Sequence, residues 1–146
     1  MREKPFIVLM AEDNEHDIIA VEEAWEHFNI VNPLFIVNNG SECLDYLYRR
    51  GEFSDPEKSP RPNLVLLDIK MPKVDGLTVL KTIRNDQKLK RIPVVILTTS
   101  RQEEDKIRSY DLGVNAYICK PVQFENLSNA IKTINLFWEM VEFPGE

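Results

Sequence analysis

The stretch Leu64–Asp68, with the sequence LVLLD, is a short run of β-branched and aliphatic residues that ends in a carboxylate. The runs Phe6–Ala11, Val94–Leu97 and Ala116–Cys119 have the same character, and each is followed by polar residues. Short continuous apolar runs are typical of strands that are buried on both faces of a parallel sheet. We therefore expect the fold to be built around such a sheet.

Segments with the apolar spacing of helices separate these runs. The expected strands cover residues 6–11, 34–37, 64–67, 94–97 and 116–119, and the expected helices cover about 15–28, 41–50, 77–85, 101–112 and 124–138. Alternation of strands and helices predicts an α/β protein with a doubly wound parallel sheet and right-handed crossovers. A strand order of 2-1-3-4-5 would place the first and third strands side by side.

Polar residues and a glycine mark several of the expected helix ends. Asn14 is expected to cap the first helix, and Ser100 with Glu103 has the pattern of a capping box. Gly113 is expected to end the helix that starts after Ser100, in the C′ position. The segment Gly51–Asn63, which contains three prolines, is expected to be an unusually long loop.

Length and composition are those of one globular domain. We expect a single domain over residues 1–146, with its core at about 6–138 and a C-terminal extension at 139–146. The net charge of -6 argues against non-specific nucleic-acid binding. No apolar stretch approaches the roughly 18 residues of a membrane span, and the N-terminus lacks a signal-peptide pattern. Because Cys43 and Cys119 are too few for a disulfide framework, we expect both to be reduced and structural, and the protein to be cytoplasmic.

Ionisable and hydroxyl side chains follow the predicted strands. Glu12 and Asp13 follow the first strand, Asp68 the third, Thr98 the fourth and Lys120 the fifth. Because the carboxyl ends of parallel strands meet at one edge of a sheet, we expect these side chains to converge. Each residue alone has an ordinary explanation as a cap, a turn or a strand residue. Their joint occurrence indicates a functional site.

The residue types in this site suit phosphoryl transfer to a carboxylate. Carboxylates about 4 Å apart repel by roughly 4 kcal/mol per pair at an effective dielectric constant near 20, so the cluster requires a cation or a proton. Oxygen ligands of this kind suit Mg²⁺. A carboxylate can then attack a phosphoryl group, while the ammonium of Lys120 and the hydroxyl of Thr98 hold the phosphoryl oxygens.

Several motifs carry a resemblance to the receiver domains of two-component response regulators. They are Leu9–Asp13 (LMAED), Leu66–Gly76 (LLDIKMPKVDG), Leu97–Ser100 (LTTS) and Ala116–Pro121 (AYICKP). The resemblance extends over almost the whole chain, from Phe6 to Trp138. It implies a flavodoxin-like (βα)5 fold. It also implies a signalling domain that is not an enzyme, apart from Mg²⁺-dependent self-phosphorylation and slow autodephosphorylation.

By this resemblance Asp68 is the phosphoacceptor. Asp13 and Asp68 are expected to bind Mg²⁺ directly, with the backbone carbonyl of Lys70 as a further ligand. Glu12 matches a position that is often Asp and that usually acts on the metal through water. Mg²⁺ is therefore the cofactor that the resemblance implies.

The resemblance also assigns the residues that respond to the phosphoryl group. Lys120 and Thr98 are expected to bind it, and the peptide bond from Lys120 to Pro121 is expected to be cis. Thr98 and Tyr117 match a switch pair, in which the hydroxyl moves toward the phosphoryl group and the ring swings inward. The new charge of about -1.5 to -2 would thus change the surface formed by the fourth helix, the fifth strand and the fifth helix.

Three neighbouring residues match positions that tune dephosphorylation. They are Lys70, Thr99 and Ser100. Thr99 departs from the commonest pattern, because the family often has a smaller Ala or Gly there. We expect its bulkier side chain to narrow access to the phosphoryl group.

The loop at residues 51–63 and the end of the chain indicate the kind of response regulator. Both resemble those of small regulators that partner bacterial phytochrome histidine kinases, especially cyanobacterial ones. We expect no output domain, because the chain ends within a few residues of the last predicted helix. The expected partners are a sensor histidine kinase, which we expect to be a phytochrome, and an unidentified downstream protein. We do not expect binding to nucleic acid or to a membrane. Trp138, Val141 and Phe143 are expected to form part of a homodimer interface.

Features of the sequence disfavour three rival functions. An aspartyl-phosphate phosphatase of the haloacid dehalogenase type needs a general acid two residues after the nucleophile, where this chain has Lys70. A flavodoxin-like electron carrier needs a phosphate loop rich in glycine and hydroxyl groups, whereas Glu12 to Glu15 would repel a flavin phosphate. A degenerate receiver that acts as a phosphorylation-independent scaffold is disfavoured by the intact acids together with Thr98 and Lys120.

Overall fold

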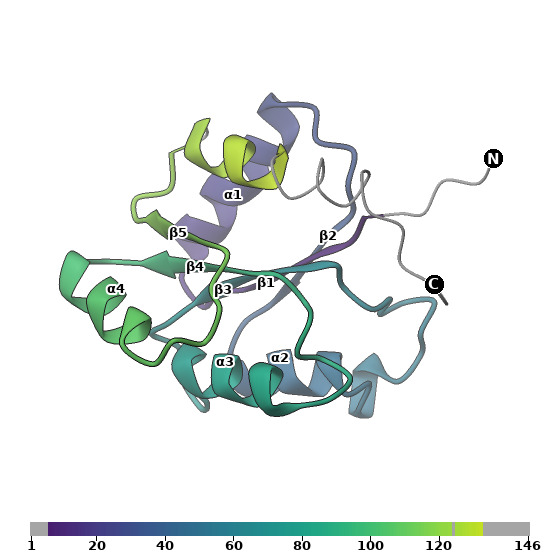
Figure 1. Cartoon of the computed structure of the whole chain (residues 1–146). Coiled ribbons are helices and arrows are strands. Elements are labelled where there is room, and N and C mark those ends of the chain that lie inside the picture. Colours follow the sequence, from purple (N-terminus) through teal and green to yellow (C-terminus); the bar gives the residue numbers. More distant parts are fainter. Residues whose placement is uncertain (1–5, 124, 133–146) are drawn as a thin grey trace.

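A parallel five-stranded sheet forms the centre of the molecule (Figure 1). The computed structural model describes residues 6–123 and 125–132. In chain order the strands are β1 (Val8–Ala11), β2 (Leu34–Val37), β3 (Leu64–Asp68), β4 (Val94–Thr98) and β5 (Ala116–Cys119). They lie in the order β2-β1-β3-β4-β5, which confirms the predicted flavodoxin-like α/β fold.

Helices cover both faces of this sheet, as Figure 1 shows. On one face lie α1 (Glu15–His27) and a helix at residues 125–132. On the other face lie α2 (Gly40–Leu47), α3 (Gly76–Asn85) and α4 (Arg101–Arg108). The last helix was predicted to continue to Trp138, but residues 133–146 lie outside the described part of the chain. The expected contributions of Trp138, Val141 and Phe143 lie there as well.

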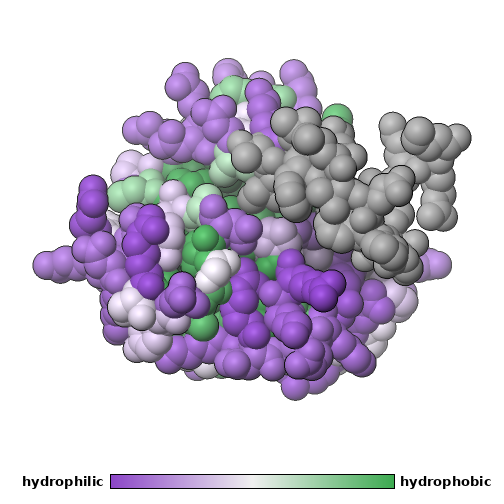
Figure 2. Space-filling model, in the orientation of Figure 1, coloured by the Kyte–Doolittle hydropathy of each residue, from purple (hydrophilic) through white to green (hydrophobic). Residues whose placement is uncertain are grey.

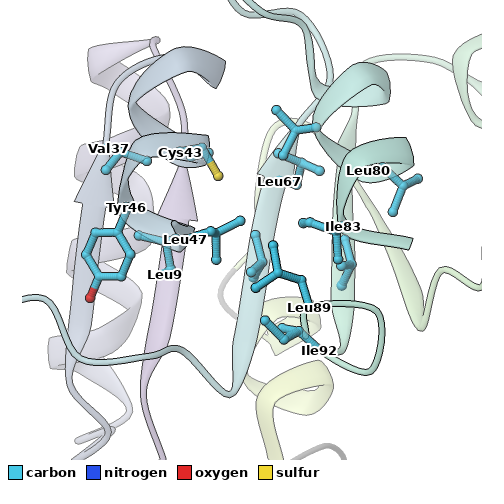
Figure 3. Close-up of a cluster of buried hydrophobic side chains, with 14 of the residues drawn as sticks. Leu9, Val37, Cys43, Tyr46, Leu47, Leu67, Leu80, Ile83, Leu89 and Ile92 are labelled. Atoms are coloured by element: carbon cyan, nitrogen blue, oxygen red, sulfur yellow. The ribbon is translucent and has the colours of Figure 1, made fainter. Parts of the chain in front are cut away.

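Alternate residues of each strand face opposite helical layers. Leu9 and Leu67 belong to the cluster beneath α2 and α3, which Figure 3 shows in close-up. Val8 and Leu66 instead face the layer that contains α1 and residues 125–132. All four side chains are fully buried, and burial of each such aliphatic side chain contributes about 1.5–3 kcal/mol. The sheet is therefore anchored by apolar packing on both faces, which fixes where its strands end.

The outer surface of the helices is largely hydrophilic in the view of Figure 2, where apolar side chains show mainly between the upper and lower layers. Within the described residues, no helix is long and apolar enough to cross a membrane.

Cys43 lies on α2 and is buried, and burial raises the pKa of its thiol to about 12. Cys119 ends β5 and is exposed, so of the two thiols only Cys43 contributes to the core.

Side chains cap the starts of four helices. Asn14, Asn39, Asp75 and Ser100 each accept the backbone N–H three residues further on, at 3.1, 2.8, 2.8 and 3.1 Å. Each such cap contributes about 1 kcal/mol to helix stability. The cap by Asn14 was predicted, and so was the cap by Ser100.

The boundaries of two predicted helices were wrong. The helix expected to start at Ser41 starts at Gly40, because Asn39 caps it, and it ends at Leu47 rather than near Arg50. The helix after Ser100 was expected to end at Gly113, yet α4 ends at Arg108. Asp111 already has a positive φ of 50°, and its N–H donates to the Arg108 carbonyl, so the chain leaves the helix before Gly113.

The long loop between α2 and β3 is partly ordered by aromatic contacts. It begins with a short 3-10 helix, η1 (Gly51–Phe53), which the sequence analysis did not predict. The rings of Phe53 and Tyr46 lie 5.3 Å apart, and the Tyr46 hydroxyl donates to the carbonyl of Pro60 at 2.8 Å. The loop is therefore held against α2.

A glycine allows α3 to start directly against the end of β3. A Cβ atom on Gly76 would lie 2.1 Å from the carbonyl oxygen of Asp68 and 2.7 Å from Cα of Ile69. The Gly76 N–H donates to the Ile69 carbonyl at 2.8 Å. The absence of a side chain at Gly76 thus sets the path of the loop that leaves Asp68.

We predict that Gly76→Ala lowers the free energy of unfolding by about 2 kcal/mol or more, because either the loop or β3 has to move. Gly51→Ala is the matched control. Its φ of +59° makes alanine unfavourable, but no atom lies within 4 Å of the added Cβ, so a loss of about 1 kcal/mol is expected. Urea unfolding measures both variants, and equal losses would contradict the steric explanation.

Candidate functional site

The parallel register brings the predicted site residues to one edge of the sheet. The pairing of β1 with β3 places Glu12 beside Asp68, just past the last paired residues. On β4 and β5, the N–H of Lys120 donates to the Thr98 carbonyl at 2.7 Å. Residues at the carboxyl ends of four separate strands are therefore neighbours at this edge, as was predicted from the sequence.

The ammonium of Lys120 lies at the centre of this site. Its Nζ atom is 2.8 Å from Oε1 of Glu12, 3.0 Å from Oδ1 of Asp68 and 3.0 Å from Oδ2 of Asp17. Glu12 and Asp68 are buried, and the Lys120 side chain is only 12% exposed. The peptide bond from Lys120 to Pro121 is cis. Lys120 thus supplies the positive charge for a cluster of otherwise repelling acids.

Three carboxylates in the site are arranged as ligands of one cation. One oxygen from each of Glu12, Asp13 and Asp68 lies within 4.8 Å of the others. Asp13 is exposed, so the cluster opens to solvent on that side. Carboxylate oxygens with access to water are the ligands that Mg²⁺ prefers. The donor set therefore fits a hard divalent cation.

Burial and ion pairing act in opposite directions on these groups. Burial raises the pKa of Glu12 to about 7, although its contact with Lys120 works against the shift. Burial also raises the pKa of Asp68, again opposed by Lys120. Burial disfavours the Lys120 ammonium, but its bonds to Glu12, Asp17 and Asp68 outweigh this and raise its pKa. The lysine stays charged and stabilises the ionised acids.

Thr98 ends β4 with a buried hydroxyl that has no partner among the described residues. Its side chain belongs to a residue that is 1% exposed, and Oγ1 makes no hydrogen bond. A buried hydroxyl without a partner is destabilising. The Thr98 hydroxyl is therefore available to donate a hydrogen bond to a group that binds at the site.

Tyr117 on β5 lies half-buried beneath α4. The guanidinium of Arg108 is 4.2 Å from the centre of the Tyr117 ring. Arg108 in turn is bound by Glu104, with 2.9 Å between Nε and Oε2. The ring is thus covered by a residue of α4, which connects β5 to that helix.

The three predicted tuning residues are all exposed at the rim. Ser100 caps α4, and the N–H of Thr99 donates to Oε1 of Glu103 at 2.9 Å. The Lys70 ammonium lies 3.8 Å from Oε2 of the same carboxylate. In a capping box Glu103 would bind the N–H of Ser100, so this part of the prediction was wrong by one residue. The Glu103 carboxylate connects Thr99 to the loop after Asp68.

The sequence analysis missed the contact between Asp17 and Lys120. Asp17 lies in the first turn of α1, and no role in the site was predicted for it. An acid in the first turn of a helix is common because it interacts favourably with the helix dipole, so its type carried no special signal. The fold brings the first turn of α1 close to Lys120, which follows β5 and lies far from Asp17 in the sequence.

The geometry described above provides what phosphoryl transfer to an aspartate requires: an acceptor carboxylate, oxygen ligands for a divalent cation and a fixed ammonium. The family described as "Response regulator receiver domain" matches residues 8–132. The chain belongs to this family, whose members are signalling domains that pair with sensor histidine kinases and not classical enzymes. The phosphatase and electron-carrier alternatives are therefore not favoured.

Several relatives are similar over almost their whole length. Response regulator Rcp1 of Synechocystis sp. is 42% identical over 97% of this chain and 95% of its own. The bacteriophytochrome response regulator RtBRR has 40% identity and a TM-score of 0.85, covering 98% of this chain and 84% of that one. The phosphorylated cyanobacterial phytochrome response regulator RcpA has 38% identity and a TM-score of 0.76, covering 97% and 100%. A solved structure of Rcp1 holds Mn²⁺.

We predict that Lys120→Met destabilises the protein in a pH-dependent way. Glu12 already has a raised pKa in the folded state, so its contribution to stability falls as pH rises from about 4.5 through 7. Loss of Lys120 would raise the pKa of Glu12 and Asp68 further and steepen this fall. The expected loss is about 3 kcal/mol or more at pH 8 and clearly less at pH 5.

Thermal unfolding at the two pH values, in the presence of a chelator, measures this difference. Lys58→Met removes an exposed lysine and is the matched control, for which no pH-dependent loss is expected. An equal loss at both pH values for Lys120→Met would show that the ammonium does not offset the buried acids.

Proposed function

We propose that this protein is a response regulator that accepts a phosphoryl group on Asp68 from a sensor histidine kinase. One observation carries the proposal: the buried Asp68 carboxylate lies 3.0 Å from the Lys120 ammonium and within a cluster of oxygen ligands. In the transfer, a carboxylate oxygen of Asp68 forms a bond to phosphorus. The phosphorus–nitrogen bond of the phosphohistidine breaks, and the imidazole leaves with the electron pair.

Mg²⁺ is the cofactor that we propose for this site. Asp13 and Asp68 would hold it directly, with Glu12 through water and with the backbone carbonyl of Lys70. The metal, when bound, offsets the negative charge that gathers on the transferred oxygens. The presence of Mn²⁺ in Rcp1 and the acidic cluster of this chain support a divalent cation.

Lys120 and Thr98 are the residues that we propose bind the phosphoryl group. The ammonium is already placed beside the acceptor oxygen at 3.0 Å, so it can pair with a phosphoryl oxygen without a large movement. The Thr98 hydroxyl lacks a partner among the described residues and would gain one. Both interactions favour the phosphorylated form.

The phosphoryl group would then act on the surface formed by α4, β5 and the helix at residues 125–132. Movement of Thr98 toward the phosphoryl group leaves space that the Tyr117 ring fills. Inward movement separates the ring from Arg108, now 4.2 Å away, and so changes the surface of α4. Lys70, Thr99 and Ser100 lie around the acceptor and are proposed to set the rate of autodephosphorylation.

The proposed partner is a phytochrome histidine kinase in the cytoplasm. The similarity to RtBRR and RcpA, which are phytochrome response regulators, supports this choice. The proposal includes an unidentified downstream protein, a single domain over residues 1–146, and a homodimer that involves the C-terminal segment. It includes no enzymatic activity beyond Mg²⁺-dependent self-phosphorylation and slow autodephosphorylation.

Incubation with acetyl phosphate tests the proposed function. We expect the intact mass to increase by one phosphoryl group when Mg²⁺ is present and not when it is chelated. Asp68→Asn should abolish the gain, whereas Asp105→Asn, which alters an exposed carboxylate of α4, should not. A gain that survives in Asp68→Asn would contradict the assignment of the phosphoacceptor, and no gain in the native protein, even with a phosphorylated phytochrome kinase, would contradict the function.

We also predict that Thr99→Ala accelerates both phosphorylation by acetyl phosphate and autodephosphorylation, by about threefold or more, because a smaller side chain at the rim opens the acceptor to small molecules. The backbone bond from Thr99 to Glu103 can persist in this variant. Thr99→Val keeps the bulk but not the hydroxyl, and is expected to behave like the native protein. Unchanged rates in Thr99→Ala, followed by mass spectrometry over time, would contradict the proposed narrowing.

A further inference from the structure

We propose that Asp17 is a positioning residue for phosphoryl transfer, because it tethers the Lys120 ammonium from the first turn of α1. This inference rests on the proposed phosphorylation of Asp68. It adds to that site a residue of α1 that does not belong to the acid cluster.

The contacts of Lys120 match the number of hydrogens that it can donate. A lysine ammonium has three N–H donors and no acceptor. Its Nζ atom lies 2.8–3.0 Å from one oxygen each of Glu12, Asp17 and Asp68. The ammonium thus forms ion pairs with three carboxylates on different elements, which restricts its position.

Asp17 differs from the other two partners in what else it can bind. Glu12 and Asp68 belong to the oxygen cluster that fits a cation, together with Asp13, whereas Asp17 does not. When a cation and a phosphoryl group occupy the site, Glu12 and Asp68 are shared with them. The contact between Asp17 and Lys120 competes with neither and can persist throughout the cycle.

The backbone holds Asp17 in place for this contact. Its N–H donates to Oδ1 of Asn14 at 3.1 Å, in the cap of α1. Its side chain is only 20% exposed, unlike that of Glu15 in the same turn, which is exposed. The helix dipole favours both acids, and within the described residues Glu15 makes no ion pair. Of these two first-turn acids, Asp17 is therefore the one that binds Lys120.

A tether of this kind affects the rate of transfer more than the fold. The lysine ammonium is a point charge on a flexible four-carbon stem, and Asp17 contacts it from the side of α1. Without Asp17, one donor turns to water and the ammonium spends less time beside the acceptor. A small misplacement of a charged group at a reacting centre has a large effect on rate.

Phosphorylation kinetics with acetyl phosphate and saturating Mg²⁺ test the tether. Asp17→Ala is expected to slow the reaction by about tenfold. Asp17→Asn, which keeps an oxygen acceptor in the same place, should recover part of the rate. Glu15→Ala is the matched control for a first-turn acid and should stay within about twofold of the native rate. Equal rates for Asp17→Ala and Glu15→Ala would overturn the proposal.

A spectroscopic measurement tests the tether without phosphorylation. In ¹⁵N-labelled protein without phosphodonor, we expect a protected ammonium signal from Lys120, assigned by its loss in Lys120→Arg. The signal should broaden or vanish in Asp17→Ala and persist in Glu15→Ala. A signal that is unchanged in Asp17→Ala would overturn the proposal.

The two measurements separate the tether from the proposed function. Suppose that the native protein is not phosphorylated but that the Lys120 signal depends on Asp17. The contact between Asp17 and Lys120 is then supported, whereas both the proposed function and the role of Asp17 in phosphoryl transfer are overturned. If phosphorylation occurs and Asp17→Ala is as fast as Glu15→Ala, the function stands and the positioning role is overturned.

Discussion

The structure depends on one electrostatic constraint, which is that several carboxylates meet at the end of a parallel sheet with a single lysine to offset them. Glu12 and Asp68 are buried beside Lys120, and Asp13 completes the oxygen cluster at the solvent side. Burial of ionised groups is tolerated only where they are paired. The ammonium provides that pairing and leaves room for a divalent cation. The same arrangement that would be unfavourable in an ordinary core is therefore the basis of the proposed function.

The surroundings of this cluster connect it to the surface. Gly76 lets the start of α3 lie directly against the end of β3, so the loop that follows Asp68 has little freedom. On the other side, Glu103 of α4 binds the N–H of Thr99 and faces Lys70, while Arg108 covers Tyr117. A change of charge at Asp68 can therefore affect the position of α4 through two sets of contacts. One set lies at the start of that helix and the other at its end.

Much of this could be predicted from the sequence because the signals are local or follow from parallel strands. Apolar runs located every strand, and Asp68, Thr98 and Lys120 could be placed together because the carboxyl ends of parallel strands converge. Helix ends were less predictable. The chain leaves α4 before Gly113, and Asp111 already has a positive φ. No distinctive sequence pattern identifies an aspartate with a positive φ. The contact between Asp17 and Lys120 joins two elements far apart in the sequence, so packing alone reveals it.

In the proposed function, the acid cluster forms with Lys120 and Thr98 one site for a cation and a phosphoryl group on Asp68. A crystal structure with Mg²⁺ and beryllium fluoride, a mimic of the phosphoryl group, tests it most directly. We expect the fluoride to be bound to the Asp68 carboxylate, in contact with the Lys120 ammonium and the Thr98 hydroxyl, with Mg²⁺ on Asp13 and Asp68. Fluoride bound at another carboxylate, or Mg²⁺ bound away from this cluster, would contradict the account.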